Sequence, residues 1–308
     1  MTFKWGSIMR YIIGGTFLLL LLIAFYSGSA GTAESGSEYR GEGFNGYWYN
    51  GEAELTRYQL QQVRYGDVHE GDAVLIFVTE DFLPEKQVKL DNGSSSEKPI
   101  KILKLNLTKK FYTGIYPYSM MSSVFTPLKT EKALKVTTSV QEWCGHTFMQ
   151  LNARNGQYDG SLYSYFQNEG DQTFSLKNVM LEDEIWTKIR LNPAALPTGT
   201  VDIIPASQYQ RLAHIAPQVA TAEADVRSVS DNISEYRVIY TDIKRSLNIR
   251  FESIFPHRIL GWEESHQPVF GGAKVMTTKA KRTHSIMLDY WNRNGIDDRS
   301  LLSKLGLN

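Results

Sequence analysis

The sequence predicts a mainly β fold with a few helices, of the α+β class, built as one large antiparallel curved sheet or an incomplete barrel. Short runs in which apolar and polar residues alternate recur along the chain, and turn-forming residues separate them. Apolar residues at helical spacing are confined to a few short segments. The single cysteine excludes an internal disulfide, so packing must stabilise the fold.

The N-terminus has the order of properties of a secretory signal. Lys4 and Arg10 give a positive start, an uninterrupted apolar run covers residues 17–25, and small residues follow directly. This order predicts a signal peptide or signal anchor over residues 1–30, and export to the periplasm or cell envelope. The flanks favour cleavage. The alternative is an uncleaved membrane anchor over residues 11–26, which falls short of the about 20 residues of a spanning helix.

A polar, Gly- and Ser-rich stretch over residues 31–46 predicts a flexible linker. A single β-rich exported domain is expected to follow over residues 47–308. Residues 51–63 and the apolar run 73–78 flank a turn and predict the first hairpin. Residues 100–107 alternate in part and predict a further strand.

The middle of the chain contains the strongest hairpin signal, Asn155-Gly156 between two apolar runs. Residues 181–190 place apolar residues four apart and predict a helix that Pro193 ends. Residues 218–233 are a weaker candidate for a helix or a loop. Further strands are expected over residues 236–240, 247–251, 255–262 and 283–291, before a short last helix that Asp297 caps.

Charge and residue spacing exclude several classes of function. The chain has 33 basic and 33 acidic residues, and without Lys4 and Arg10 it has 31 against 33, a net charge near −2. It has no basic stripe of the kind that binds nucleic acid. The histidines are scattered without metal-ligand spacing, so neither a metal nor a cofactor is expected. Membrane contact is expected only through the N-terminal segment, if that segment stays uncleaved.

Five strings of the sequence together resemble a known group of proteins. They lie at residues 47–58, 73–89, 111–120, 138–146 and 182–199. They resemble exported envelope proteins of Bacteroidota-type bacteria that often carry the label "septum formation inhibitor Maf". The resemblance covers the chain after the linker and implies an envelope or periplasmic address, but no activity.

The label itself does not fit this sequence. True Maf proteins are smaller cytoplasmic nucleotide pyrophosphatases with a Ser-Pro-Arg-Arg-type phosphate loop after the first strand. This chain has no such loop, and it begins with an export signal. The resemblance therefore carries no expectation of pyrophosphatase activity.

The string Glu142-Trp143-Cys144-Gly145-His146 contains the residue types of a nucleophilic cysteine site. On a regular strand Glu142, Cys144 and His146 share one face, where carboxylate and imidazole would lie beside the thiol. The structural interpretation is a buried, unreactive thiol, because free cysteine is among the most buried residue types. We favour structural packing. An exported hydrolase that uses Cys144 and His146 is the alternative.

An aromatic stretch suggests a ligand groove. Tyr112, Tyr116, Tyr118 and Met121 would form an adaptable apolar wall inside the curved sheet. One helix is too small to cover the concave face, so loops over residues 111–128 or a lipid-like ligand would fill the remaining space. The function expected is therefore binding or carriage of an apolar ligand or partner by an envelope protein.

Overall fold

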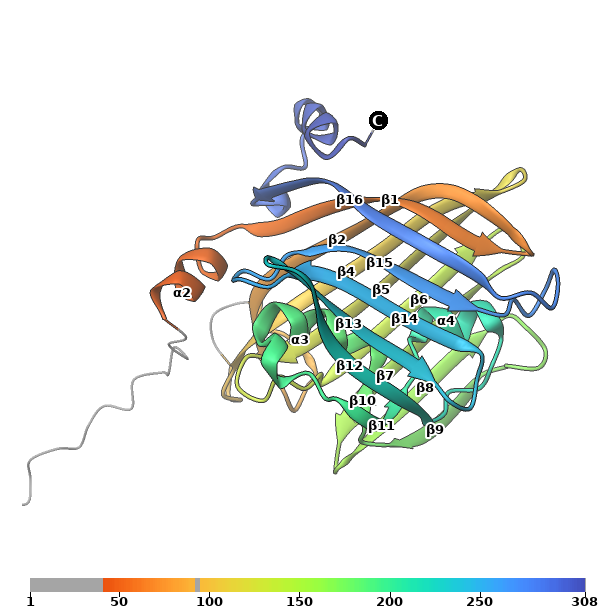
Figure 1. Cartoon of the computed structure of the whole chain (residues 1–308). Coiled ribbons are helices and arrows are strands. Elements are labelled where there is room, and N and C mark those ends of the chain that lie inside the picture. Colours follow the sequence, from red (N-terminus) through yellow and green to blue (C-terminus); the bar gives the residue numbers. More distant parts are fainter. Residues whose placement is uncertain (1–40, 92–94, 308) are drawn as a thin grey trace, which may run out of the picture. The chain divides into compact units, whose positions relative to one another are not determined.

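The computed structural model describes residues 41–91 and 95–307, which form the β-rich domain (Figure 1). The first half contains α2 (Glu42–Trp48), β1 (Ala53–Arg64), β2 (Asp67–Leu83), β3 (Val88–Lys89), β4 (Ile100–Thr113), β5 (Tyr116–Pro127), β6 (Lys135–Glu142), β7 (Gly145–Arg154), β8 (Gln157–Ser164) and β9 (Gln172–Lys177). The second half contains β10 (Met180–Leu181), η1 (Glu182–Glu184), α3 (Ile185–Leu191), η2 (Pro193–Ala195), β11 (Gly199–Ile204), α4 (Ser207–Ala213), β12 (Ala220–Ser230), β13 (Ile233–Tyr240), β14 (Arg245–Glu252), β15 (Ile259–His266), β16 (Met276–Leu288), η3 (Tyr290–Asn292) and η4 (Ile296–Leu305).

In the described residues, sixteen strands form one sheet of two meanders. Strands β1 to β9 follow one another outward from the middle of the sheet, with β3 paired only to β2, and β10 to β16 return from the opposite edge. The first long strand, β1, therefore lies beside the last one, β16, as Figure 1 shows. All neighbours pair antiparallel except β10 and β11, which pair in parallel over two residues.

The sheet is curved but not closed. Its order ends with β9 at one edge and β10 at the other. The edges approach each other, since the Lys177 Nζ on β9 lies 3.0 Å from the Asp202 Oδ2 on β11. The predicted fold class, a mainly β protein with a large curved sheet and few helices, is confirmed.

Alternation along the strands creates the core. On β4, Leu103, Leu105 and Leu107 point inward and are no more than 6% exposed, because alternate side chains of a strand share a face. Lys104, on the other face, points outward, and its Nζ lies 3.1 Å from the Glu80 Oε1 of β2. Each fully buried leucine contributes about 1.5–3 kcal/mol.

Helices α3 and α4 lie between the two halves of the sheet and cover its concave side (Figure 1). The helix predicted at residues 181–190 is confirmed as η1 followed by α3, which ends before Pro193. On α3, Ile185 and Ile189 are fully buried, and Trp186 packs edge-on against Trp262 of β15, with ring centroids 5.0 Å apart.

Two expectations from the sequence, one about the cover and one about residues 218–233, are wrong. Residues 111–128 are not inward-folded loops, because they belong to the β4–β5 hairpin. Residues 218–233 are neither helix nor loop, since β12 occupies 220–230 and its alternate alanines are buried. The second helix of the cover, α4, was not predicted, because most of its buried residues are polar.

The expected linker over residues 31–46 overlaps the first described helix. Helix α2 starts at Glu42, and its Phe44 and Trp48 are buried against the domain. The predicted signal of residues 1–30, and the linker up to residue 40, lie outside the described residues. Within the described residues, no helix is long and apolar enough to cross a membrane.

Candidate functional site

One end of the sheet gathers several connections around a pocket of about 440 Å³, here called the mouth pocket. The β1–β2 turn, the β6–β7 turn, the β8–β9 loop, the end of α4 and the β15–β16 loop each contribute. Antiparallel hairpins place alternate turns at the same end, so segments far apart in the sequence meet here. Its lining includes Arg64, Tyr65, Cys144, Phe166, His214 and Phe270.

Arg64 is the distinctive group of the mouth pocket. Its side chain donates hydrogen bonds to the Tyr118 hydroxyl at 3.2 Å, the Leu212 carbonyl at 2.5 Å and the Tyr65 hydroxyl at 3.4 Å. It is only 8% exposed, and no described carboxylate forms an ion pair with it. A guanidinium has five N–H donors, so two remain for a ligand.

The other buried arginines of the described chain have carboxylate partners. Arg190 pairs with Glu54, Arg211 with Glu169 and Arg245 with Glu182. A buried cation is costly unless it is paired. Three rings surround Arg64 in place of a counterion: Tyr65, Tyr118 and Phe270, whose centroids lie 4.4, 5.4 and 5.8 Å from its Cζ.

Tyr65, in the β1–β2 turn, has a backbone with positive φ and a hydroxyl with a lowered pKa. Its φ is +55°, and the following Gly66 has φ +84°. Burial opposes ionisation of Tyr65, but hydrogen bonds with Tyr116 and Tyr118 and the Arg64 cation lower its pKa below the usual value. Burial raises the pKa of Tyr118, whose hydroxyl lies 2.8 Å from that of Tyr65. The pair thus presents a polarised hydroxyl beside Arg64.

A carboxylate fixes the opposite wall. The Glu169 Oε1 lies 2.6 Å from the His214 Nδ1, and its Oε2 accepts from Arg211 at 3.1 Å and from Ser164 at 2.7 Å. The side chain of Glu169 is only 7% exposed. With its Nδ1 held in this way, the His214 ring is fixed in orientation.

Two phenyl rings flank His214. The ring centroid of Phe166 lies 4.6 Å from that of His214, and that of Phe270 lies 5.7 Å from it, with ring planes inclined by 78° and 76°. Phe270 is 45% exposed and therefore presents ring surface to a ligand. The mouth pocket thus combines an unpaired cation with aromatic walls, the mixture typical of small-molecule sites.

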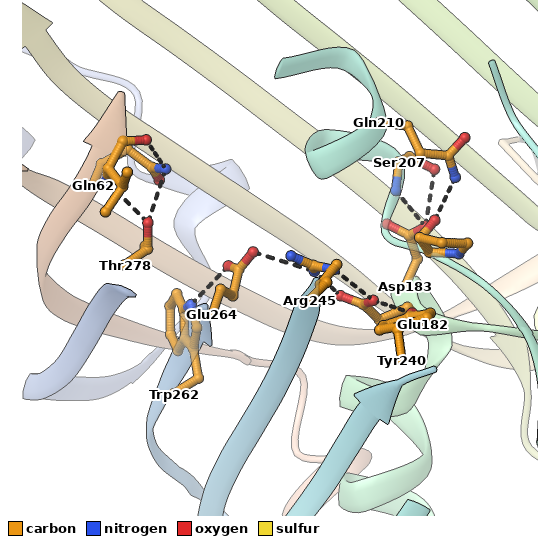
Figure 2. Close-up of polar contacts among 12 residues, drawn as sticks. Gln62, Glu182, Asp183, Ser207, Gln210, Tyr240, Arg245, Trp262, Glu264 and Thr278 are labelled. Carbon is orange, nitrogen blue, oxygen red and sulfur yellow. Dashed lines mark hydrogen bonds and ion pairs between the residues drawn. The ribbon is translucent and has the colours of Figure 1, made fainter. Parts of the chain in front are cut away.

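A chain of buried charges lies in the interior (Figure 2). Arg245 of β14 pairs with Glu182 and lies 3.5 Å from Glu264, which also accepts from the Lys109 Nζ at 2.8 Å. Burial alone would raise the pKa of Glu264, but Lys109 and Arg245 lower it to about 2. Tyr240 donates to Glu182, and the Trp262 Nε1 donates to Glu264 at 3.2 Å.

Two small cavities share lining residues with this chain of charges, and one of them also shares residues with the mouth pocket. One of about 30 Å³ touches Arg64, Tyr65 and Glu264, and one of about 20 Å³ touches Glu264, Glu182 and Asp183. Either volume suits about one water molecule with polar neighbours. Glu264 therefore borders both cavities.

Asp183 is the buried acid that has no ion pair among the described residues. It accepts from the Ser207 backbone N–H at 3.0 Å and from the Ser207 hydroxyl at 2.9 Å, which joins η1 to α4. Desolvation raises its pKa to about 6, although the two hydrogen bonds oppose this. Figure 2 shows Asp183 directed at Ser207.

The expected burial of Cys144 is wrong. Trp143 and Cys144 form the turn between β6 and β7, where Cys144 is exposed. Glu142 hydrogen-bonds this turn and raises the thiol pKa, with Arg64 opposing. His146 is exposed on β7. Glu142 and Cys144 line the mouth pocket, whereas His146 is not part of its lining. The turn breaks the strand alternation on which the expected grouping depended.

The predicted apolar wall is divided between two faces of the sheet. Tyr118 is buried and Tyr116 is half-buried near the mouth pocket, but Tyr112 is 64% and Met121 38% exposed on the outer face. Placing Tyr112 and Met121 in one wall with the other two is therefore wrong. Pairing of Thr108 with Met121 and of Tyr112 with Pro117 fixes the register of β4 and β5. Because side chains alternate between faces, Met121 lies on the opposite face of β5 from Tyr116 and Tyr118.

The sequence analysis missed Arg64, Tyr65, Glu169, His214 and Phe270. Each stands beside a turn or in a loop, and no short spacing connects them. One signal was available: Tyr65-Gly66 occupies a two-residue hairpin turn in which a bulky residue adopts positive φ. In such a turn a tyrosine in place of asparagine suggests a role for its side chain.

A second hollow, of about 490 Å³, lies on the outer face over β13 to β16 and β1. Gly261 lies in its lining, beside the place where β14 and β15 shift register. Its Arg250 pairs with Glu235 and its Lys279 with Glu263. These charges compensate one another, so the mouth pocket is the stronger candidate.

No group of three or more His, Cys, Asp or Glu in the described residues is arranged to hold a metal ion. Comparisons with protein-family models, with curated proteins and with solved structures found no match for this chain.

Proposed function

We propose that this protein is an exported envelope protein that binds a small ligand with an anionic group and an apolar body in the mouth pocket. The observation that carries the proposal is Arg64, a nearly buried guanidinium with spare donors and no described carboxylate partner, at the base of an aromatic pocket. A ligand anion would supply the missing counterion.

The physical gain from such a ligand is considerable. A hydrogen bond to a charged group contributes about 1.5–3 kcal/mol, which corresponds to roughly a 10- to 150-fold change in Kd. Apolar ligand surface against Phe166 and Phe270 adds about 25 cal/mol for each Å² removed from water. The pocket volume of about 440 Å³ suits a small molecule.

The alternative expected from the sequence is a hydrolase that uses Cys144 and His146, but His146 does not line the pocket. A hydrolase in this pocket would have to use His214, which pairs with Glu169, in place of His146. A thiolate is the attacking species in such enzymes. Glu142 raises the pKa of Cys144 and so favours the unreactive thiol. Binding is therefore the function that this geometry supports better.

Calorimetric titration tests the proposal with indole-3-acetate and octanoate as anions and indole-3-acetamide as a neutral control. We expect saturable binding of at least one anion, and a loss of at least about tenfold in affinity for Arg64→Gln. Arg64→Lys keeps the positive charge, so its affinity for the anion should lie between that of the parent and that of Arg64→Gln. Cys144→Ser alters the same pocket without removing the cation and should bind like the parent.

Equal affinity of the parent and a folded Arg64→Gln variant would overturn the proposal, as would no binding of either anion. Hydrolysis of an ester of either acid by the parent, but not by Cys144→Ser, would favour the hydrolase. The export address depends on the predicted signal of residues 1–30. N-terminal sequencing of the natural protein tests it, and an intact Met1 in the cytoplasmic fraction would contradict it.

A further inference from the structure

We infer that the ligand of the mouth pocket is a flat aromatic acid, whose ring lies between Phe166 and Phe270 while its carboxylate binds Arg64. This inference rests on the proposed function and narrows it to one chemical class. Its basis is the position of the rings around the pocket and the way in which each is held.

The contacts of both phenyl rings with His214 limit their separation, and this limit leaves room for a flat guest between them. Their distances from the His214 ring, 4.6 and 5.7 Å, limit the separation of the two centroids to about 10 Å. Phe166 and Phe270 make no ring contact with each other within the described chain. A flat ring stacked between two others needs about 7–8 Å, twice the usual contact distance between carbon atoms. An unbranched chain would leave much of both ring faces without contact.

Both walls are held in place before any ligand arrives. Phe166 begins a tight loop in which its carbonyl accepts from the Glu169 and Gly170 N–H groups, both at 3.0 Å, and its own N–H donates to the Ser164 hydroxyl at 3.2 Å. Ser164 in turn donates to Glu169, the residue that holds His214. One carboxylate thus ties the Phe166 wall to the ring at the back of the pocket.

The Phe270 wall is held by a close backbone contact. A Cβ on Gly271 would lie 2.2 Å from the Tyr65 carbonyl carbon, and one on Gly66 would lie 2.2 Å from the Gly271 oxygen. The β15–β16 loop therefore sits directly on the β1–β2 turn, and Phe270 comes to within 5.8 Å of the Arg64 Cζ. Pre-formed aromatic walls lower the ordering cost of binding a rigid ring.

The carboxylate and the ring would then bind to adjoining parts of one site. Arg64 offers its two remaining N–H donors, and the polarised Tyr65 hydroxyl lies beside them. Aromatic pairs in offset or edge-on geometry contribute about 0.5–1.5 kcal/mol beyond the area that they bury. Two such walls favour an aromatic acid over an aliphatic acid of similar size.

Calorimetric titration of the parent with indole-3-acetate, octanoate and indole-3-acetamide distinguishes the classes. We expect indole-3-acetate to bind at least about fivefold tighter than octanoate, and at least about tenfold tighter than the neutral amide. Phe166→Leu and Phe270→Leu keep apolar bulk without a ring, and should lose most of the preference over octanoate. Tyr163→Leu, a matched change of an exposed aromatic on β8, should leave the preference unchanged.

Saturation-transfer NMR on the parent with indole-3-acetate gives a test that does not depend on how the variants fold. The ring protons should receive more saturation than the methylene. If octanoate binds as well as indole-3-acetate, or the methylene is the more saturated part, the aromatic inference fails while the proposed function stands. If neither anion binds, the aromatic inference and the proposed function both fail.

Discussion

At the scale of single residues, the partners of a group decide what it can do. Arg190 and Arg245 are fully buried with carboxylates and hold the structure together, whereas Arg64 is nearly as buried but has hydroxyl, carbonyl and ring neighbours. Tyr65 adopts positive φ in the same kind of turn that Asn155 occupies. Such a backbone costs about 1–3 kcal/mol for a bulky residue. This cost indicates that the Tyr65 side chain has a functional role.

Asp183 gives a prediction at this scale. Its pKa is about 6 in the fold and about 3.9 when unfolded, so the folded protein binds the extra proton between these values. Its contribution to stability is therefore present below about pH 4 and is lost as pH rises through 6. Asp183→Asn keeps an acceptor for Ser207 but cannot ionise, so it does not lose this stability as pH rises. Relative to the parent, its free energy of unfolding should rise by about 2 kcal/mol from pH 4 to pH 7.

Urea unfolding at a series of pH values measures this difference. Ser207→Ala is a suitable control, because it removes the hydroxyl that donates to Asp183 but leaves the Asp183 carboxyl able to titrate. A constant difference between parent and Asp183→Asn from pH 4 to pH 7 would contradict the raised pKa.

At the scale of elements, turns and loops build the mouth pocket, and strands only present them. The β15–β16 loop, residues 267–275, brings Phe270 to the pocket because Gly271 lets its backbone approach the Tyr65 turn. The β8–β9 loop supplies Phe166 and Glu169, and the end of α4 supplies His214 in a left-handed conformation. Binding residues on loops held by a rigid scaffold are a common arrangement.

Gly271→Ala tests the role of the β15–β16 loop. The added methyl would meet the Tyr65 backbone at 2.2 Å, and the residue has φ +96°, so the loop must move away and take Phe270 with it. We expect ligand affinity to fall at least about fivefold, with a change in melting temperature of only a few degrees.

Gly272→Ala is the matched control for this loop. Its φ is +134°, so backbone strain is present, but its Cβ would meet nothing within 4 Å. Titration calorimetry and hydrogen exchange of residues 267–275 report the two effects. Similar losses in the two variants would mean that backbone strain, and not the contact with Tyr65, controls Phe270.

At the scale of the whole molecule, buried ion pairs join the helical cover to the sheet. Glu54 of β1 and Arg190 of α3 are 136 positions apart in the chain and form two hydrogen bonds, at 2.5 and 2.7 Å. Burial disfavours the Glu54 carboxylate, but Arg190 outweighs this and lowers its pKa. Glu182, Arg245 and Glu264 connect η1 to β14 and β15 in the same way.

Arg190→Met should lower the free energy of unfolding by about 3–5 kcal/mol, because it leaves the Glu54 carboxylate buried without its partner. Adding Glu54→Gln to this variant should recover part of that loss. Denaturant unfolding of the parent, both single variants and the double variant measures the coupling. Additive losses in the double variant would contradict a direct interaction between the two side chains.

The sequence by itself determined the class of this fold, because strand alternation and hairpin turns are local properties. The Asn155-Gly156 turn, the helix at residues 181–190 and its end before Pro193 followed from a few neighbouring residues each. The strand β12 and the helix α4 did not, since long-range packing decides the state of short segments with weak patterns.

Tertiary structure alone decided the candidate site. Arg64, Glu169, His214 and Phe270 are separated by 45 or more positions, and only the common end of many hairpins brings them together. The same geometry exposed Cys144 at a turn and sent Tyr112 and Met121 to the outer face. A sequence records which groups exist, but the missing counterion of Arg64 is a property of everything packed around it.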